Sequence, residues 1–174
     1  MNSTDPDPVS VAVVRRARTA DVAAIRLLVD AHVTDRRLLS KATVTLYEDV
    51  QEFFVAEFGR EVVGCGALHV LWQDLAEVRT VAVANELRGR GIGGLILTAL
   101  LAQADLVGVE RVFCLTFETE FFGRHGFVEI EGTPVQHEVY EELLQSYDEG
   151  VAEFLGLERV KPNTLGNTRM LRLI

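Results

Sequence analysis

The segment Arg88-Gly89-Arg90-Gly91-Ile92-Gly93 combines alternate glycines with two arginines. Glycine has no Cβ atom, so a ligand can come close to the backbone there. Val81 and Val83 alternate before this segment as in a strand, and Leu95, Ile96, Ala99 and Leu100 follow it at helical spacing. N–H groups that converge at the start of a helix attract anions, and the helix dipole adds positive potential. These features predict a site for a ligand that carries phosphates.

Two common phosphate-binding motifs do not fit this loop. A P-loop needs Lys-Ser or Lys-Thr after its last glycine, whereas Gly94-Leu95 follows here. A dinucleotide-binding turn has glycines in the order G-x-G-x-x-G immediately after a strand. Gly89, Gly91 and Gly94 have this order, but five residues separate Gly89 from Val83, where the predicted strand ends. The alternative without a ligand is a glycine-rich turn that lets a helix pack closely on a strand. The apolar strand before the loop and the amphipathic helix after it favour the ligand site.

The composition is that of a soluble globular protein. The chain has 174 residues, 48% of them apolar and 25% charged, with a formal net charge of −9. This acidity argues against nucleic acid or an anionic membrane as a partner. Cys65 and Cys114 lie far apart in apolar runs, which indicates buried reduced thiols, and the histidines lack the spacing of metal ligands. We therefore expect a cytoplasmic protein with no metal, no signal peptide and no membrane-spanning segment.

Hydrophobic periodicity and turn residues predict one α/β domain at residues 9–174 after a disordered tail at residues 1–8. Strands are expected at Val9–Arg16, Phe53–Phe58, Glu61–Leu71, Leu75–Val83, Arg111–Phe117, Phe127–Ile130 and Thr168–Ile174. Helices are expected after an N-cap at Thr19 and at Leu38–Val50, Ile92–Leu106, Glu118–Arg124 and Val135–Leu157. Gly64 and Gly66 either weaken their strand or permit close packing against it. This order of elements predicts a mixed sheet flanked by helices.

The spacing Arg88-x-x-Gly91-x-Gly93 resembles the pyrophosphate loop Q/R-x-x-G-x-G/A of the GCN5-related N-acetyltransferase (GNAT) family. The resemblance extends from Val14 to the C terminus. Within the family the chain is most similar to the amino-acid N-acetyltransferases that make N-acetylglutamate. The residues that carry this similarity are Arg15-Arg16-Ala17, Asp21-Val22, Gly64 to Leu68, Ala76-Glu77, Val81 to Val83, Arg124 to Phe127 and Asn167 to Leu171. Long members of this group carry an amino-acid-kinase-like domain before the transferase, for which we expect no room here, so inhibition by arginine stays open.

The resemblance implies a mixed, mostly antiparallel sheet in which two splayed strands form a cleft for acetyl-CoA. The implied cofactor-binding residues are Val81, Ala82, Val83, Arg88, Gly89, Arg90, Gly91, Ile92, Gly93, Thr116, Phe121 and Phe122. The backbone of Val81 and Val83 would pair with the pantetheine amides. This pairing requires the strand at Arg111–Phe117 to splay away. A backbone N–H of Val81 or Ala82 would then face the thioester oxygen as an oxyanion donor.

The resemblance also implies a general base at Glu77, which lies one strand length before the glycine loop. Burial would raise the basicity of this carboxylate enough for it to deprotonate an ammonium group. Arg79 lies two residues further along and hence on the same face of the strand, so an ion pair is an equally good interpretation, and both roles are compatible. Many family members have a tyrosine as general acid at the position of Phe122, so a tyrosine acid is not expected here. Water can protonate the departing thiolate instead.

The acceptor that the resemblance implies is the α-amine of L-glutamate or L-glutamine, in the first step of arginine biosynthesis. Carboxylate recognition calls for cations, and the implied acceptor-binding residues are Lys41, Arg79, Asn167 and Arg169, with Lys161 a further candidate. Each of them could instead be a solvated surface group. Two alternatives stay open: a transferase for another amine (a polyamine, a lysine side chain or a drug) and a module that senses acetyl-CoA without turnover. A homodimer is also left open.

Overall fold

The computed structural model describes residues 11–33, 38, 41–156 and 166–174, so the predicted tail and Lys161 lie outside the described residues. The described residues form one seven-stranded sheet in the order β1-β2-β3-β4-β5-β7-β6. The strands are β1 Val13–Arg16, β2 Phe53–Phe58, β3 Glu61–Trp72, β4 Leu75–Val83, β5 Arg111–Thr116, β6 Val128–Glu129 and β7 Thr168–Leu173. Neighbouring strands are antiparallel except for β4 and β5, which run parallel.

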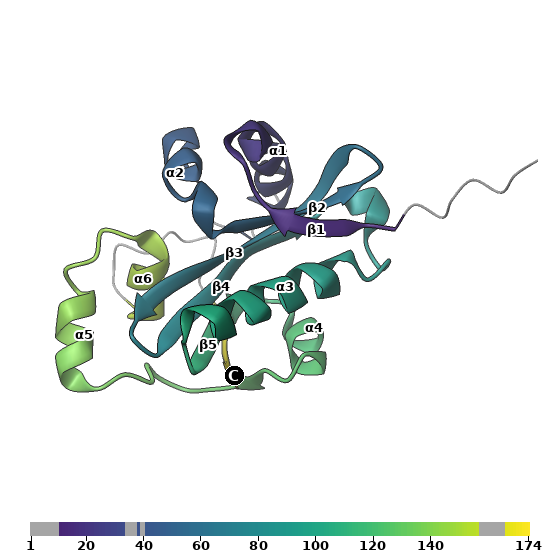
Figure 1. Ribbon diagram of the computed structural model, residues 1–174. Helices are drawn as coiled ribbons and strands as arrows, with labels where there is room; N and C mark the ends of the chain where they lie inside the picture. The colour runs from purple at the N-terminus through teal and green to yellow at the C-terminus, as the bar shows by residue number, and fades with distance from the viewer. Residues whose placement is uncertain (1–10, 34–37, 39–40, 157–165) are drawn as a thin grey trace, which may run out of the picture.

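Helices cover both faces of the sheet (Figure 1). They are α1 Val22–Val33, α2 Thr43–Glu48, α3 Ile92–Val107, α4 Thr119–Arg124, α5 His137–Leu143 and α6 Glu149–Phe154, with 3-10 turns η1 Thr19–Asp21, η2 Val50–Glu52 and η3 Asn85–Leu87. One core lies between the sheet and α3 with α4, and a second lies between the opposite face and α1 with α2. A third core joins α5 and α6 to the starts of β4 and β5. This mixed, mostly antiparallel sheet with flanking helices is the predicted fold.

Local sequence patterns explain most of these elements. The buried residues of α1 recur at helical spacing and form its inner face: Val22, Ile25, Leu28, Val29 and His32. Of the two interpretations of Gly64 and Gly66, close packing is correct. A Cβ atom on either glycine would lie 2.8 Å from the side chain of Ile96 on α3.

Three predicted helical boundaries are wrong. The N-cap before the first helix is Arg18 and not Thr19, because residues 19–21 form a 3-10 turn in which the Asp21 carboxylate accepts the Arg18 N–H at 2.7 Å. The segment at residues 38–50 is helical only at α2 among its described residues. The long helix predicted at residues 135–157 is two short ones, because the side chain of Asp148 accepts the N–H of Val151 at 3.0 Å and so caps a new helix, α6.

The strand pair β4 and β5 opens towards its C-terminal end. Their parallel pairing runs from Leu75–Arg111 to Glu77–Phe113 and goes no further in the described part of the chain. β5 meanwhile stays paired with β7 as far as Thr116. β4 therefore turns away from β5, and this is the splayed pair that was predicted.

A bulge changes the orientation of β4 at the same level. The register with β3 shifts between Cys65–Ala82 and Ala67–Arg79, and Thr80 adopts φ +58°, a left-handed conformation that is rare for a β-branched residue. Because of the extra residue, Val81 packs in the α3 core, whereas Arg79 forms ion pairs on the opposite face. The bulge thus places residues before and after it on different sides of the sheet.

Candidate active site

A cleft of about 760 Å³ lies in the opening between β4 and β5. Residues from both faces of the sheet line it: Ile92 and Phe121 from the side of α3 and α4, and His32 and Arg79 from the side of α1. The cleft therefore passes through the sheet where the two strands separate. A long ligand bound on one face can present its end to a group on the other.

The glycine loop forms one wall of the cleft. Gly91 is the N-cap of α3 with φ +79°, and Gly89 has φ +77°, so both occupy left-handed conformations that favour glycine. Apart from the adjoining backbone, no atom of the described residues lies within 4 Å of the position that a Cβ on either glycine would take. The first N–H groups of α3 have no partner within the helix and face this space. Backbone donors at the start of α3 are thus free of helical partners, and anion binding by this loop stays a prediction.

Ten of the twelve predicted cofactor-binding residues line the cleft: Val81, Val83, Arg88, Gly89, Gly91, Ile92, Gly93, Thr116, Phe121 and Phe122. The side chain of Ala82 instead packs in the core beneath α1, so its predicted part depends on its backbone alone. Arg90 is exposed and does not line the cleft. Gly93 lies beside α4, where a Cβ on it would be 3.4 Å from the Phe121 ring, at ordinary contact distance.

The cleft also contains residues that were not predicted to bind the cofactor. Glu118 forms an ion pair with Arg88 at 3.5 Å, which links the loop after β5 to the glycine loop. Arg124 and His125 line the cleft from α4 and its end, and Nδ1 of His125 is bonded to the Phe121 carbonyl at 2.8 Å. The Arg124-His125-Gly126-Phe127 segment had been noticed in the sequence, but its direction towards the cleft follows from α4 packing on β7.

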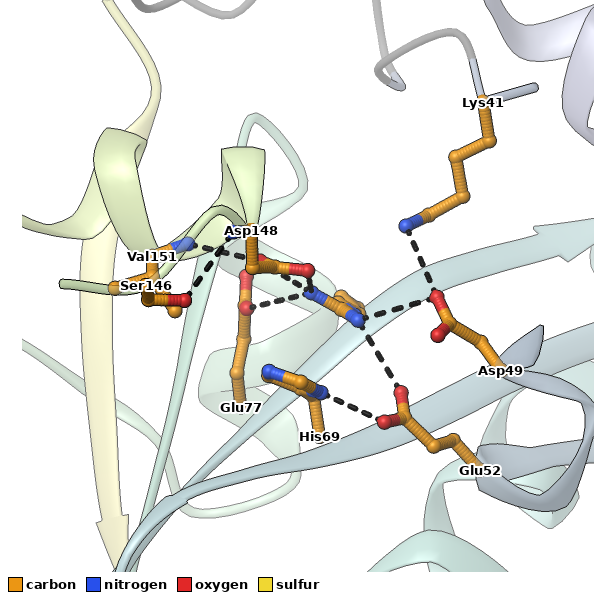
Figure 2. A network of polar contacts seen from close by, with 9 residues as sticks. Lys41, Asp49, Glu52, His69, Glu77, Ser146, Asp148 and Val151 are labelled. Atoms are coloured by element: carbon orange, nitrogen blue, oxygen red, sulfur yellow. Dashed lines mark hydrogen bonds and ion pairs between the residues drawn. The ribbon is translucent and has the colours of Figure 1, made fainter. Parts of the chain in front are cut away.

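Arg79 is the centre of an ion-pair network, and Figure 2 shows the carboxylates of Asp49, Glu52, Glu77 and Asp148 converging there. Its Nη1 lies 2.8 and 2.9 Å from the two oxygens of Asp148, and its Nη2 lies 3.2 Å from Glu52 and 3.6 Å from Asp49. Glu77 Oε2 is 3.8 Å from Nη1, so the predicted pair with Arg79 is present. Lys41 approaches Asp49 at 3.8 Å. Four carboxylates thus surround two cations.

Glu77 is buried next to this network, with 4% of its surface exposed. Burial raises its pKa from 4.5 to about 7, against the attraction of Arg79, because the charged carboxylate is poorly solvated there. Its Oε2 has no hydrogen-bond partner among the described residues. A carboxylate with this pKa and an unused oxygen is suited to accept a proton at neutral pH.

The four predicted acceptor-binding residues form two groups. Lys41 and Arg79 share the carboxylate of Asp49, and burial together with the charge of Arg79 lowers the pKa of Lys41. Asn167 and Arg169 lie at the start of β7, where Asn167 donates to Glu153 and Arg169 donates to the Phe154 carbonyl at 3.2 Å. Asp148, Glu153 and Phe154 all belong to α6 or its cap, so α6 touches both groups.

The described residues show neither a metal-binding cluster nor a membrane-spanning helix. No group of three or more His, Cys, Asp or Glu side chains is arranged to hold a metal ion within those ranges. None of the helices there is long and apolar enough to cross a membrane. The chemistry to be explained is therefore that of the cleft and the Arg79 network.

The splayed parallel strand pair, with a glycine-rich helix start between the strands, is the arrangement that the resemblance to acetyltransferases implies for an acetyl-CoA cleft. Residues 49–129 match the acetyltransferase (GNAT) domain family. An amino-acid acetyltransferase of Mycobacterium tuberculosis is 61% identical over 166 residues, which cover 93% of this chain and 94% of that protein. An uncharacterized N-acetyltransferase of Chlorobaculum tepidum is 36% identical over 71% of this chain and 80% of its own length.

Solved structures agree with these sequence relatives. A Mycobacterium tuberculosis protein crystallised in complex with CoA and NLQ has a TM-score of 0.89 and 61% identity, over 93% of this chain and 99% of that one. N-acetylglutamate synthase from Neisseria gonorrhoeae, complexed with coenzyme A and N-acetyl-glutamate, shares the fold at a TM-score of 0.74 and 20% identity, over 95% of this chain and 36% of that one. Both structures contain CoA, in agreement with the predicted co-substrate.

The chain belongs to the GNAT acetyltransferase family. It is thus an acyltransferase, and the predicted family, fold class and enzyme class are confirmed.

Proposed function

We propose that this protein transfers the acetyl group of acetyl-CoA to the α-amine of an amino acid, either L-glutamate or L-glutamine, and that it serves the first step of arginine biosynthesis. One observation carries the proposal: a single cleft joins the glycine loop on one face of the sheet to Arg79 and its network on the other. The 61% identical relative, which is named an amino-acid acetyltransferase, supports the class of acceptor.

Acetyl-CoA would bind along β4 and the start of α3. The N–H groups at Gly89 to Gly93 would hold the pyrophosphate, with Arg88 adding charge. Beyond Glu77 the edge of β4 has no β5 partner in the described structure, so Val81 and Val83 can pair with the pantetheine amides. The thioester would then lie in the opening in the sheet. An N–H of Val81 or Ala82 would stabilise its oxygen as negative charge develops.

Glu77 would act as the general base. An α-ammonium group must lose a proton before its nitrogen can attack the thioester carbon, and the Glu77 carboxylate can accept that proton, directly or through water. The new C–N bond forms as the C–S bond breaks, and the thiolate leaves with the electron pair. Phe122 is buried in the cleft wall and has no proton to donate. Water would therefore protonate the thiolate.

The acceptor would be held by Arg79 and Lys41 on one side and by Asn167 and Arg169 on the other. Arg79 lines the cleft, and Nε of Arg169 is buried without a hydrogen-bond partner in the described structure. An α-carboxylate matches these donors. Four carboxylates against two cations around Arg79 favour the neutral amide of glutamine over the second carboxylate of glutamate.

The test measures CoA release with a thiol reagent as each acceptor is added to enzyme and acetyl-CoA. Glutamate and glutamine should raise the rate above the hydrolytic background, and the ratio of their kcat/KM values identifies the preferred one. The panel should also contain the remaining amino acids, spermidine and a lysine peptide. If neither glutamate nor glutamine increases the rate, the proposed acceptor is wrong.

A second candidate function is acetylation of a cationic amine. The surplus of carboxylates around Arg79 favours it, because those groups would attract a polyamine or a lysine side chain. The same panel separates the two functions. Acetyl-CoA binding by calorimetry without turnover of any amine would indicate a sensor.

A further inference from the structure

The side chain of Asp148 performs two tasks at once. Its carboxylate caps α6 by accepting the Val151 N–H at 3.0 Å. The same carboxylate accepts hydrogen bonds from Nη1 of Arg79 at 2.8 and 2.9 Å, and Arg79 lines the cleft. The position of α6 is therefore coupled to which carboxylate binds the Arg79 guanidinium.

Helix α6 covers Glu77 in this arrangement. Gly150 lies so close that a Cβ on it would be 3.0 Å from Oε2 of Glu77. Phe154, at the other end of α6, stacks on Phe113 with ring centroids 4.1 Å apart, and Phe113 is the strand partner of Glu77 on β5. An amine in the cleft has little direct access to Glu77 while α6 stays in place.

Asp148 binds Arg79 through a carboxylate, which is also the group that an amino acid would present to Arg79. A carboxylate of the acceptor would be the fifth around Arg79 if it joined Asp49, Glu52, Glu77 and Asp148. Like charges that close repel one another in a partly buried site, so the incoming carboxylate favours departure of one already present. Asp148 is the group whose departure releases a helix.

We propose that Asp148 is a specificity-determining residue that holds the Arg79 subsite closed until the carboxylate of an acceptor amino acid displaces it. Displacement frees the cap of α6 and uncovers Glu77, so the base is exposed when a carboxylate-bearing acceptor is bound. An amine without a carboxylate has no group to exchange with Asp148 and leaves α6 closed. This inference rests on the proposed function of the same site.

A ligand shifts such an equilibrium only by its difference in affinity for the two states. For an acceptor whose carboxylate binds Arg79, the closed state must therefore reduce the apparent affinity in proportion to the fraction of molecules that are open. Removing the charge of Asp148 should lift this reduction. Asparagine at this position can still cap the helix, so the cap and the ion pair can be tested separately.

The first experiment compares the wild type with Asp148→Asn. The KM of L-glutamine and L-glutamate should fall about tenfold, as for a site that is about one-tenth open in the wild type, and the KM of acetyl-CoA should not change. Glutamine should lose much of its advantage over 4-aminobutyramide, the same molecule without its α-carboxylate. Glu138→Gln, an exposed change of equal charge on α5, should leave both KM values unaltered.

The second experiment needs no turnover. Hydrogen exchange of the wild-type protein without acetyl-CoA should become faster at residues 150–155 when L-glutamine is added, and should not respond to 4-aminobutyramide. In Asp148→Asn the fast exchange should be present without ligand. If the wild type lacks amino-acid-dependent turnover, the proposed function fails, while the exchange response still reports on Asp148.

Gly150→Ala provides a second variant in case Asp148→Asn does not fold. Its Cβ would lie 3.0 to 3.1 Å from atoms of Asp148, Glu77 and Arg79. It should therefore separate Asp148 from Arg79 while the charge of Asp148 is kept. Its KM for glutamine should also fall. If the acceptor KM rises in Asp148→Asn, Asp148 binds the ammonium group of the acceptor. If the acceptor KM and the hydrogen-exchange rates are unchanged in both variants, α6 is static. Either result overturns the proposal.

Discussion

Replacing Glu77 by glutamine should change both the stability and the pH dependence of the enzyme. Burial raises the pKa of Glu77 from 4.5 to about 7 in the folded protein, although Arg79 acts to lower it. The unfolded chain has the ordinary value, so the folded protein holds this proton more tightly. The stabilisation that results is fully present below pH 4.5 and is lost as the pH rises to about 7.

The size of this effect follows from the shift in pKa. Each unit corresponds to about 1.4 kcal/mol, so the rise from 4.5 to about 7 lowers the free energy of unfolding by about 3 kcal/mol across that pH range. Glutamine has nearly the same shape and cannot ionise. The free energy of unfolding of Glu77→Gln minus that of the wild type should therefore increase by about 3 kcal/mol from pH 4.5 to above pH 7.

Urea titrations at several pH values measure this difference, with the fluorescence of Trp72, the single tryptophan, as the signal. Subtraction of the two curves cancels the titration of groups that are common to both proteins. Glu61→Gln, an exposed change of equal charge on β3, is the matched control. A difference that is also flat for Glu77→Gln would show that burial does not raise the pKa of Glu77.

The same variant tests the role of Glu77 in catalysis. A general base must be ionised, so the wild-type kcat/KM for the acceptor, which reports on the free enzyme, should rise with pH through about 7. Glu77→Gln should not show this pH dependence. Its kcat should be about 10²- to 10⁴-fold lower than that of the wild type, and its affinity for acetyl-CoA should be unchanged. A variant with the pH–rate profile of the wild type would exclude Glu77 as the base.

Three further predictions concern the glycines and the thiols. Gly91→Ala should weaken CoA binding in calorimetry by at least about tenfold, because Gly91 faces the cleft. It should also cost about 1–2 kcal/mol of stability, because Gly91 has φ +79°. Unchanged CoA affinity would show that this loop does not bind the phosphates. Gly64→Val should lower the free energy of unfolding in urea by about 1–3 kcal/mol, because its Cβ would lie 2.8 Å from Ile96; a stable variant would mean that α3 can shift. Cys65 and Cys114 should resist thiol reagents until the protein is unfolded, because burial raises the pKa of both, to about 12 for Cys65; rapid labelling of the native protein would contradict this burial.

Much of the fold could be predicted because its signals are local. The buried stripe of α1 and the start of α3 at residue 92 follow from helical periodicity and from glycine at the N-cap. The glycine loop was recognisable for a similar reason, since φ values near +79° at Gly91 restrict the residue type at that position. Such features depend on residues within a few positions of one another.

The acceptor side of the site could not be predicted in the same way. Arg79 was expected to bind a substrate carboxylate, yet Asp148, which lies 69 positions later in the chain, already binds it here. Asp148 itself drew no attention, because it interrupts a segment that had the spacing of one long helix. A short-range pattern contains no information about which distant side chain reaches a buried guanidinium.

The sequence by itself determined the family, the glycine loop and the residue types that can hold a phosphate or accept a proton. The tertiary structure decided how they are joined. In a regular strand, Val81 would lie on the same face as Glu77. The bulge at Thr80 moves Val81 to the opposite face. The strand edge proposed to bind the cofactor and the proposed base therefore lie on different sides of the opening between β4 and β5. That outcome depends on where β4 parts from β5 and on how α6 docks, and both are set by contacts between segments far apart in the chain.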